Sequence, residues 1–210
     1  DYKVTGVQTC ALPIWVTYLK KYTHRYYKDS RKQYLYALIL FTLFVENVSL
    51  MSQFYVINWF ARNKNVLKDT DQQVKYTRNE ENIHALVGMK IINTIREEYP
   101  ELFDKELEEK ILSEAVEAYN SEAKIVDWMV NGIQEDGLTA AHLKEFIKDR
   151  INESLRGINF PPAFEPDNEL LKDTKWFNEE LLGNNMTDFF HSRPVEYSKK
   201  SQSFSEDDLF

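Results

Sequence analysis

A carboxylate and an imidazole stand three residues apart in the stretch TRNEENIHALVGMKII, as Glu81 and His84. If the stretch is helical, three residues advance the chain by about 300°, so the two side chains lie on one face, one turn apart. Together they could bind one metal ion or bridge a pair of ions. Taken alone, the Glu-x-x-His spacing is a weak signal, because surface helices often combine a solvated glutamate with a packing histidine in this way.

A third candidate ligand, Glu46, is the only charged side chain between Gln33 and Ala61. A carboxylate in a buried helix costs free energy unless it is paired, protonated or bound to a metal ion. Two carboxylates and one imidazole form a hard, oxygen-rich set that suits iron or manganese. In ferritin-like bundles, two helices each contribute a glutamate and two others each contribute Glu-x-x-His. Glu46, Glu81 and His84 would therefore supply half of a dimetal site.

The segment that carries Glu46 is expected to form one long helix over Gln33–Ala61. Its first half, YLYALILFTLFV, is apolar on all sides, so a membrane span is the obvious alternative. The second half carries Asn, Ser and Gln side chains and no second span follows, which favours a central helix buried in a helical bundle. Leu50 and Phe54, one and two turns after Glu46, could then wall the metal pocket.

A second helix, from about Asp71 to Glu98, is expected to carry the Glu-x-x-His pair, with Asp69 or Thr70 as its N-cap. A third helix would follow over residues 101–130, and Thr139 would cap a fourth. The apolar contacts of the second helix would come from Leu86, Val87, Met89, Ile91, Ile92 and Ile95. Further core residues would be Met51, Phe54, Trp59, Trp128 and Trp176.

The composition favours an all-α protein. Among 210 residues there are 6 glycines and 6 prolines, 43% of the residues are hydrophobic and 29% are charged. This balance suits helices around an apolar core. The net charge of −8 makes nucleic acid an unsuitable partner, since binding phosphates requires a basic surface. We therefore expect a helical bundle that binds neither nucleic acid nor a membrane.

Residues 1–14, DYKVTGVQTCALPI, resemble the in-frame translation of a short-read sequencing adapter, and we interpret them as a non-native segment. Cys10, the only cysteine, belongs to this segment. The rest of the chain then has no disulfide and no thiol nucleophile, which is compatible with a reducing cytoplasm. On this interpretation, residues 15–190 form a partial helical domain and residues 191–210 a flexible, polar C-terminal tail.

The stretches LFVENVSLMSQFYVINWF and TRNEENIHALVGMKIINTI, followed by KWFNEELLGNNMTDFFHSRPVEY, resemble the small (β) subunit of class I ribonucleotide reductase. The resemblance implies a ferritin-like helical bundle, here partial because the N-terminal helices are missing. It also implies two iron ions, or manganese and iron, with Glu46, Glu81 and His84 as ligands. Glu80 stands where the family often has an aspartate that contacts the ligands but does not bind the metal ions. An alternative register would make Glu80 the ligand, but the family's Glu-x-x-His spacing favours Glu81.

The same resemblance implies a function. The family uses a dimetal centre and oxygen to generate a radical, which the large subunit uses to reduce ribonucleotides to deoxyribonucleotides. By this resemblance, Tyr197 corresponds to a tyrosine of the radical pathway. The resemblance also implies that the small subunit is a cytoplasmic homodimer. The family's extreme C-terminus docks the large subunit, and a flexible segment with apolar anchors and acidic residues suits a groove on a partner. The docking residues implied here are Phe204, Asp207, Asp208, Leu209 and Phe210.

Two other functions stay open at this point. One is a different ferritin-like di-iron oxygenase or an iron-binding protein, against which the tail and the FFHSRPVEY segment argue. The other is a metal-free helical interaction module, which predicts that Glu46 faces away from Glu81 and His84. Residues 15–33 provide no acidic ligand and no second Glu-x-x-His. We therefore expect half of a metal site, and a polypeptide that is inactive by itself.

Overall fold

A computed structural model of the chain describes residues 25–186, and their side chains as far as residue 180. Every regular element among these residues is helical, which confirms the all-α prediction. The chain divides into two compact units, one up to Lys175 and one from Trp176 onward. The second unit contains most of helix α8 (Lys175–Met186). The elements of the first unit are α2 (Ser30–Leu40), the π-helical segment η2 (Phe41–Glu46), α3 (Met51–Lys64), α4 (Lys68–Glu98), the short 3-10 turn η3 (Pro100–Leu102), α5 (Lys105–Met129), α6 (Ala140–Gly157) and α7 (Asn168–Lys172).

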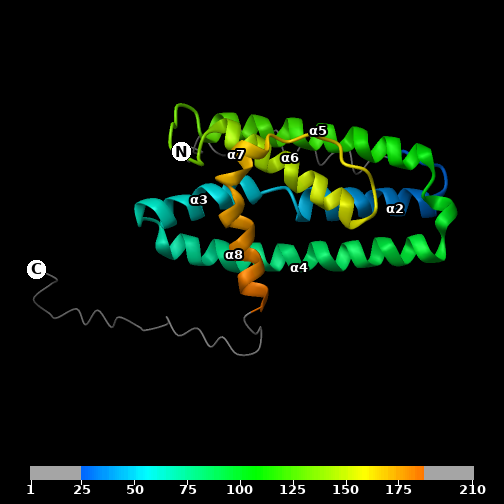
Figure 1. Cartoon of the computed structure of the whole chain (residues 1–210). Helices are drawn as coiled ribbons and strands as arrows, with labels where there is room; N and C mark the ends of the chain where they lie inside the picture. The colour runs from blue at the N-terminus through cyan, green and yellow to red at the C-terminus, as the bar shows by residue number, and fades with distance from the viewer. Residues whose placement is uncertain (1–24, 187–210) are drawn as a thin grey trace, which may run out of the picture. The chain divides into compact units, whose positions relative to one another are not determined.

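In the first unit, α2, η2 and α3 follow one another through the middle of the helical layers (Figure 1). The long helix α4 packs along one side of this line and contacts all three of its elements. On the other side, α5 contacts α2, while α6 contacts η2, α3 and α5. The segment that carries Glu46 is therefore packed between the helix that carries Glu81 and His84 and the helices that follow.

The core explains why the apolar segment lies in the middle. Leu35, Ile39, Leu43 and Phe44 are completely buried, and so is Met51 beyond them. Full burial of one such side chain stabilises the folded state by roughly 1.5–3 kcal/mol. The facing helices contribute the buried side chains Ile111, Ala115, Ile125, Val126, Leu143, Ile147, Ile151 and Leu155.

The prediction of one continuous helix from Gln33 to Ala61 was wrong. The chain passes from α2 into η2, leaves helical geometry after Glu46 and starts α3 at Met51. At the break, the backbone amide and the hydroxyl of Ser49 both donate to the carbonyl of Phe44, at 3.0 and 2.8 Å. A serine that bonds nearby carbonyls competes with helical hydrogen bonding. Leu50 then adopts a left-handed conformation with φ 68°.

Helix ends were predicted with mixed success. The hydroxyl of Thr139 accepts from the amide of His142, which confirms the predicted cap of α6. The predicted caps Asp69 and Thr70 were wrong, because both lie inside α4, whose N-cap is Leu67, without a side-chain cap. The third predicted helix starts later than residue 101, since η3 intervenes and the carboxylate of Asp104 caps α5 by accepting from the Leu107 amide.

Several predicted core positions are exposed. On α4, Ile92 is fully buried, but Leu86, Val87 and Ile91 are 57%, 54% and 42% exposed. Trp128 is 38% exposed, whereas Trp59 is only 4% exposed. An apolar residue identifies the buried face of a helix only where a neighbouring element covers it, and no described element covers this part of α4. Met51 and Phe54 are buried as predicted.

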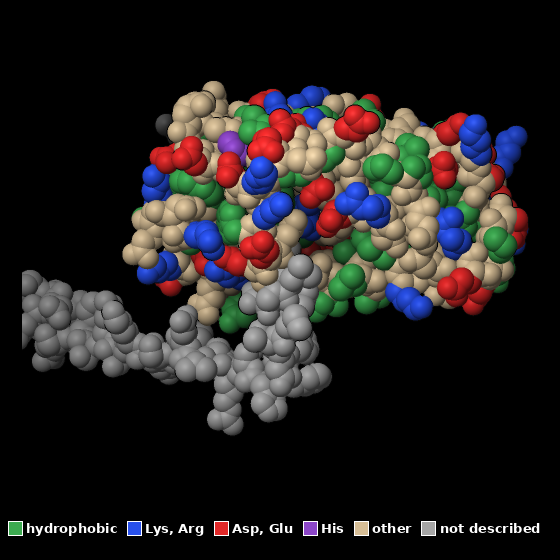
Figure 2. All heavy atoms as spheres, in the orientation of Figure 1, with side chains coloured by type: hydrophobic (Ala, Val, Ile, Leu, Met, Phe, Trp, Pro, Cys, Tyr) green, Lys and Arg blue, Asp and Glu red, His purple; other side chains and the backbone are tan. Residues whose placement is uncertain are grey.

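The segment Ser30–Lys64 is long and apolar enough to cross a membrane by length and composition alone. In its most apolar window, 61% of the residues are buried inside the protein. A core helix of a bundle has the same character, and the contacts of this segment with α4, α5 and α6 agree with that reading. On the outside, acidic and basic side chains are interspersed over the face that Figure 2 shows.

Candidate metal centre

A close contact between α4 and η2 sets the spacing of the site. Gly88 of α4 lies against Thr42 of η2, and a Cβ atom at Gly88 would be 2.3 Å from Oγ1 and 2.5 Å from Cγ2 of that threonine. Only glycine permits such an approach. Gly88 follows His84 by four residues and Thr42 precedes Glu46 by four, so the contact lies about one turn from both side chains.

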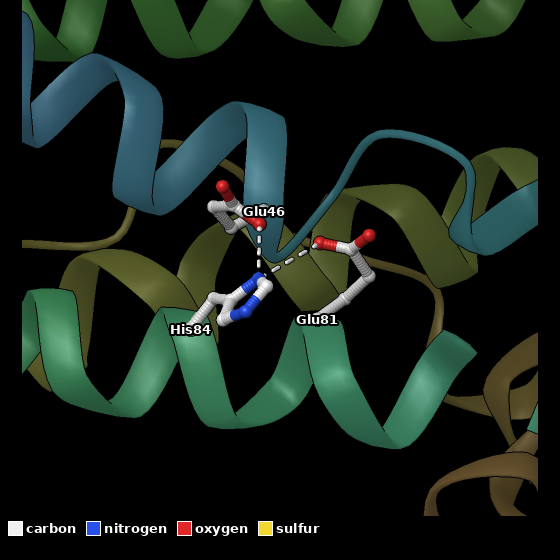
Figure 3. A group of neighbouring side chains, drawn as sticks. All are labelled: Glu46, Glu81 and His84. Atoms are coloured by element: carbon white, nitrogen blue, oxygen red, sulfur yellow. Dashed lines mark hydrogen bonds and ion pairs between the residues drawn. The ribbon is translucent and has the colours of Figure 1, made fainter. Parts of the chain in front are cut away.

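The three candidate ligands converge. Glu46, the last residue of η2, points toward α4, where Glu81 and His84 lie one turn apart (Figure 3). His84 Nδ1 is 3.3 Å from Glu46 Oε2 and 3.6 Å from Glu81 Oε2. One ligand atom from each residue lies within 4.8 Å of the other two. This spacing allows all three side chains to reach one metal ion or an adjacent pair.

The site is half-buried. The side chain of Glu46 is 16% exposed, that of Glu81 25% and that of His84 60%. Charge on the two carboxylates is therefore only partly screened by water. The imidazole, in contrast, has an open side that further ligands could approach.

The electrostatics of the cluster favour a cation. The hydrogen bond with Glu46, together with burial and the negative charge of Glu46, raises the pKa of Glu81 to about 7, while His84 opposes the rise. Two carboxylates with oxygens within 4.8 Å of each other cannot both ionise without a cost in free energy. A proton or a metal ion between them removes that cost. The donor set, two carboxylates and one imidazole, fits a hard divalent metal ion.

The other predicted site residues are not part of this cluster. Glu80 is exposed on α4 and does not belong to the group of three. Leu50 is 43% exposed and follows the helix break, so its helical spacing from Glu46, from which a place in the pocket wall was inferred, does not hold. Tyr197 and the tail residues lie outside the described part of the chain. They are Phe204, Asp207, Asp208, Leu209 and Phe210.

The sequence analysis missed a polar group that holds the end of η2. Arg150 of α6 is 7% exposed and donates to the carbonyl and the side-chain oxygen of Asn47, the residue after Glu46. A signal was present in the sequence, because Arg150 and Ser154 occupy positions in line with Phe146, Ile147 and other apolar residues of α6. A charged residue within an apolar helical stripe indicates a buried partner.

A buried network that joins α3 to α4 was also missed. Arg78, which is completely buried, donates to the side-chain oxygen of Asn58 at 3.0 Å. The side-chain amide of Asn58 donates to the Asp71 carboxylate at 2.7 Å, and the Lys75 ammonium pairs with the same carboxylate at 2.8 Å. Arg78 precedes Glu81 by three residues, so this network fixes the stretch of α4 just before the cluster.

The geometry of the cluster contradicts what a metal-free interaction module requires. A metal-free interaction module predicted that Glu46 faces away from Glu81 and His84, and the three side chains instead face one another. The convergence does not by itself separate one ferritin-like protein from another, because fold and donor set are shared among them.

Comparison with known proteins shows which ferritin-like family is meant. The chain is 29% identical over 168 residues to the ribonucleoside-diphosphate reductase subunit beta of Chlamydia pneumoniae, covering 79% of this chain and 46% of that protein. It is 33% identical over 122 residues to the protein of the same name from Aquifex aeolicus, covering 58% of this chain and 17% of that one. The chain thus spans less than half the length of these relatives.

A solved structure supports the fold. A crystal structure from Bacillus halodurans, assigned to class I ribonucleotide reductase, matches 85% of this chain and 61% of that one with a TM-score of 0.67. At 17% sequence identity, this likeness concerns the fold alone. Residues 15–170 match the family described as ribonucleotide reductase, small chain. Because that match covers most of the sequence, the chain belongs to the ribonucleotide reductase small-chain family.

Proposed function

We propose that this chain supplies half of the dimetal centre of a ribonucleotide reductase small subunit, with Glu46, Glu81 and His84 as metal ligands. The observation that carries the proposal is the convergence of these three side chains from two helices in a member of this family. The metals would be two iron ions, or manganese and iron, since the donors are mainly oxygen.

The roles of the residues follow from their chemistry. Glu46 and Glu81 would hold the ions and neutralise their positive charge, and His84 would offer a nitrogen donor through Nδ1, which lies 3.3 and 3.6 Å from the two carboxylates. When bound, the metal pair would supply the redox chemistry with oxygen from which the family makes its radical. The low exposure of both carboxylates keeps water from competing with them for the ions.

The chain would act on ribonucleotides only through a partner. We propose that the small subunit is a cytoplasmic homodimer and passes its radical to the large subunit, where ribonucleotides are reduced. Tyr197 would take part in radical transfer. Glu80 would contact the metal ligands without binding the metal ions itself. The tail would dock the large subunit through two apolar anchors and acidic side chains. These docking residues are Phe204, Asp207, Asp208, Leu209 and Phe210.

This polypeptide alone would not form a radical. Its cluster contains one separate glutamate and one Glu-x-x-His pair, whereas a complete ferritin-like centre uses two of each. The open side of His84, 60% exposed, is where we expect the remaining ligands to approach.

Binding of Mn²⁺, followed by electron paramagnetic resonance of the free ion, tests the proposed ligands. We expect the chain to bind Mn²⁺, and Glu46→Gln and His84→Ala each to weaken binding at least tenfold, because each removes one donor. Glu97→Gln is the matched control, since Glu97 is exposed and lies further along the same helix. Glu80→Gln tests the other register. Unchanged affinity in Glu46→Gln and His84→Ala would refute the half-site.

A further inference from the structure

The backbone leaves its helical path immediately after Glu46. In a continuous α-helix the carbonyl of Asn47 would accept a hydrogen bond from the amide of Met51. Here the Met51 amide donates to the carbonyl of Val48 instead, at 3.2 Å. The Asn47 carbonyl, inside the bundle, therefore needs a donor from elsewhere.

Arg150 of α6 supplies that donor. Its Nε donates to the Asn47 carbonyl at 2.9 Å, and its Nη2 donates to Asn47 Oδ1 at 2.8 Å. The Asn47 amide group donates to the hydroxyl of Ser154, which donates in turn to the carbonyl of Arg150. We call these three residues the Arg150 clamp. One guanidinium holds both the main chain and the side chain of Asn47, a geometry that suits the rigid fork of arginine and not a lysine ammonium.

The clamp is built into the core. Arg150 is 7% exposed and Ser154 is fully buried. A cation in such a place is tolerated only where its donors have partners. Burial lowers the pKa of Arg150 to about 10, so the side chain remains charged at neutral pH. The clamp therefore joins α6 to the break between η2 and α3, where the Asn47 carbonyl does not accept its α-helical hydrogen bond from Met51.

We propose that Arg150 is a positioning residue for Glu46. The clamp fixes the residue that follows Glu46, and the backbone there sets the direction of the Glu46 side chain. With Asn47 held against α6, the carboxylate is directed to α4, where His84 Nδ1 lies 3.3 Å from Glu46 Oε2. The inference rests on the proposed function only in treating Glu46 as a metal ligand.

Binding of Mn²⁺ to the full chain and its Arg150 variants tests the proposal. Removing a group that orients a ligand typically weakens metal binding 10–100-fold. We expect Arg150→Met to weaken binding by roughly that factor, and Arg150→Lys to recover only part of the loss, because an ammonium cannot hold both oxygens. Wild-type affinity in Arg150→Met, or full recovery in Arg150→Lys, would overturn the proposal.

Arg96→Met is the matched control. Arg96 donates to the carbonyl of Ile158, just after α6, and stacks on Phe103 and Phe160. It therefore also joins α4 to the end of α6, but it follows His84 by twelve residues, about 18 Å along the helix. We expect Arg96→Met to lower the melting temperature and to leave Mn²⁺ affinity unchanged. A loss of affinity equal to that in Arg150→Met would show that general loosening is the cause.

A second measurement needs no metal ion and uses the conservative variant. At one fixed pH, Glu46→Gln should shift the ring ¹⁵N resonances of His84 in the wild-type background, because the two side chains are in contact. In the Arg150→Lys background the same substitution should shift them much less. Equal shifts in both backgrounds would refute the positioning role. If the wild-type chain binds no Mn²⁺, the proposed half-site fails, and this comparison still decides the role of Arg150.

Discussion

Gly88→Ala should disturb both the packing of the helices and the metal site. The added Cβ would lie 2.3 Å from Oγ1 and 2.5 Å from Cγ2 of Thr42, where ordinary contact begins at 3.4 Å. Thr42 is 3% exposed, so its side chain cannot turn away into solvent, and α4 must move by about 1 Å relative to η2. Glu46 and His84, one turn away on these two elements, would separate with it.

The expected cost can be estimated. Overpacking of this kind costs about 1–3 kcal/mol, whereas replacing a helical glycine by alanine stabilises by about 1 kcal/mol. The net change is a destabilisation of about 0–2 kcal/mol, or a decrease in melting temperature of up to about 8 °C for a chain of this size. Circular dichroism during heating measures the stability, and Mn²⁺ affinity reports the separation of the ligands.

Two further variants isolate the contact. Thr42→Ala in the Gly88→Ala background removes both close atoms and leaves Cβ at 3.0 Å, so the double variant should be more stable than the sum of the single changes predicts. Gly157→Ala is the control, because the three atoms nearest to its Cβ all belong to the flexible Met89 side chain. The reasoning is refuted if Gly88→Ala is more stable than the wild type and binds Mn²⁺ equally well.

Three other variants test the interior and the helix break. Burial raises the pKa of Glu122, whose Oε2 accepts from the Ser52 hydroxyl, to about 8. Between pH 4.5, the ordinary pKa of a glutamate, and this value, the folded state retains a proton that the unfolded state has lost. The free energy of unfolding should therefore fall by up to about 1.4 kcal/mol per pH unit over this range. Urea unfolding across this range should show a clearly steeper slope in the wild type than in Glu122→Gln, where Glu81, with its pKa raised to about 7, still contributes. Leu50→Gly should leave the melting temperature unchanged or higher, because a left-handed conformation costs a leucine about 1–2 kcal/mol and the side chain is 43% exposed. Leu43→Ala, at a completely buried position, should cost about 2–5 kcal/mol.

The convergence of Glu81 and His84 could be predicted from the sequence because it depends only on helical spacing. Glu46 could be predicted as their partner because one carboxylate in an apolar segment needs compensation. The break after Glu46 could not be predicted, since the Asn47 carbonyl that it frees finds its donor in Arg150, 103 residues after Asn47. Local patterns do not specify such long-range hydrogen bonds.

The exposed side of α4 shows a second limit of sequence reasoning. Val87 and Ile91 are spaced as core residues would be, yet they are 54% and 42% exposed. Hydrophobic spacing marks residues that could be buried, and whether they are buried depends on a neighbouring element that the pattern of one helix does not specify. The roles of Tyr197 and the tail stay predictions, because these residues lie outside the described part of the chain.

The π-helical segment has a consequence for how this chain should be aligned with others. Each turn of η2 takes up about one residue more than an α-helical turn, so Glu46 at its end points about 100° away from the direction that an unbroken α-helix would give it. Deleting one residue between Phe41 and Val45 should therefore restore the α-helical phase and turn the Glu46 carboxylate away from α4. A relative with one residue fewer in this segment would need its glutamate at a neighbouring position to reach α4 in the same way, and a one-residue gap would then be placed inside the segment when the two sequences are aligned.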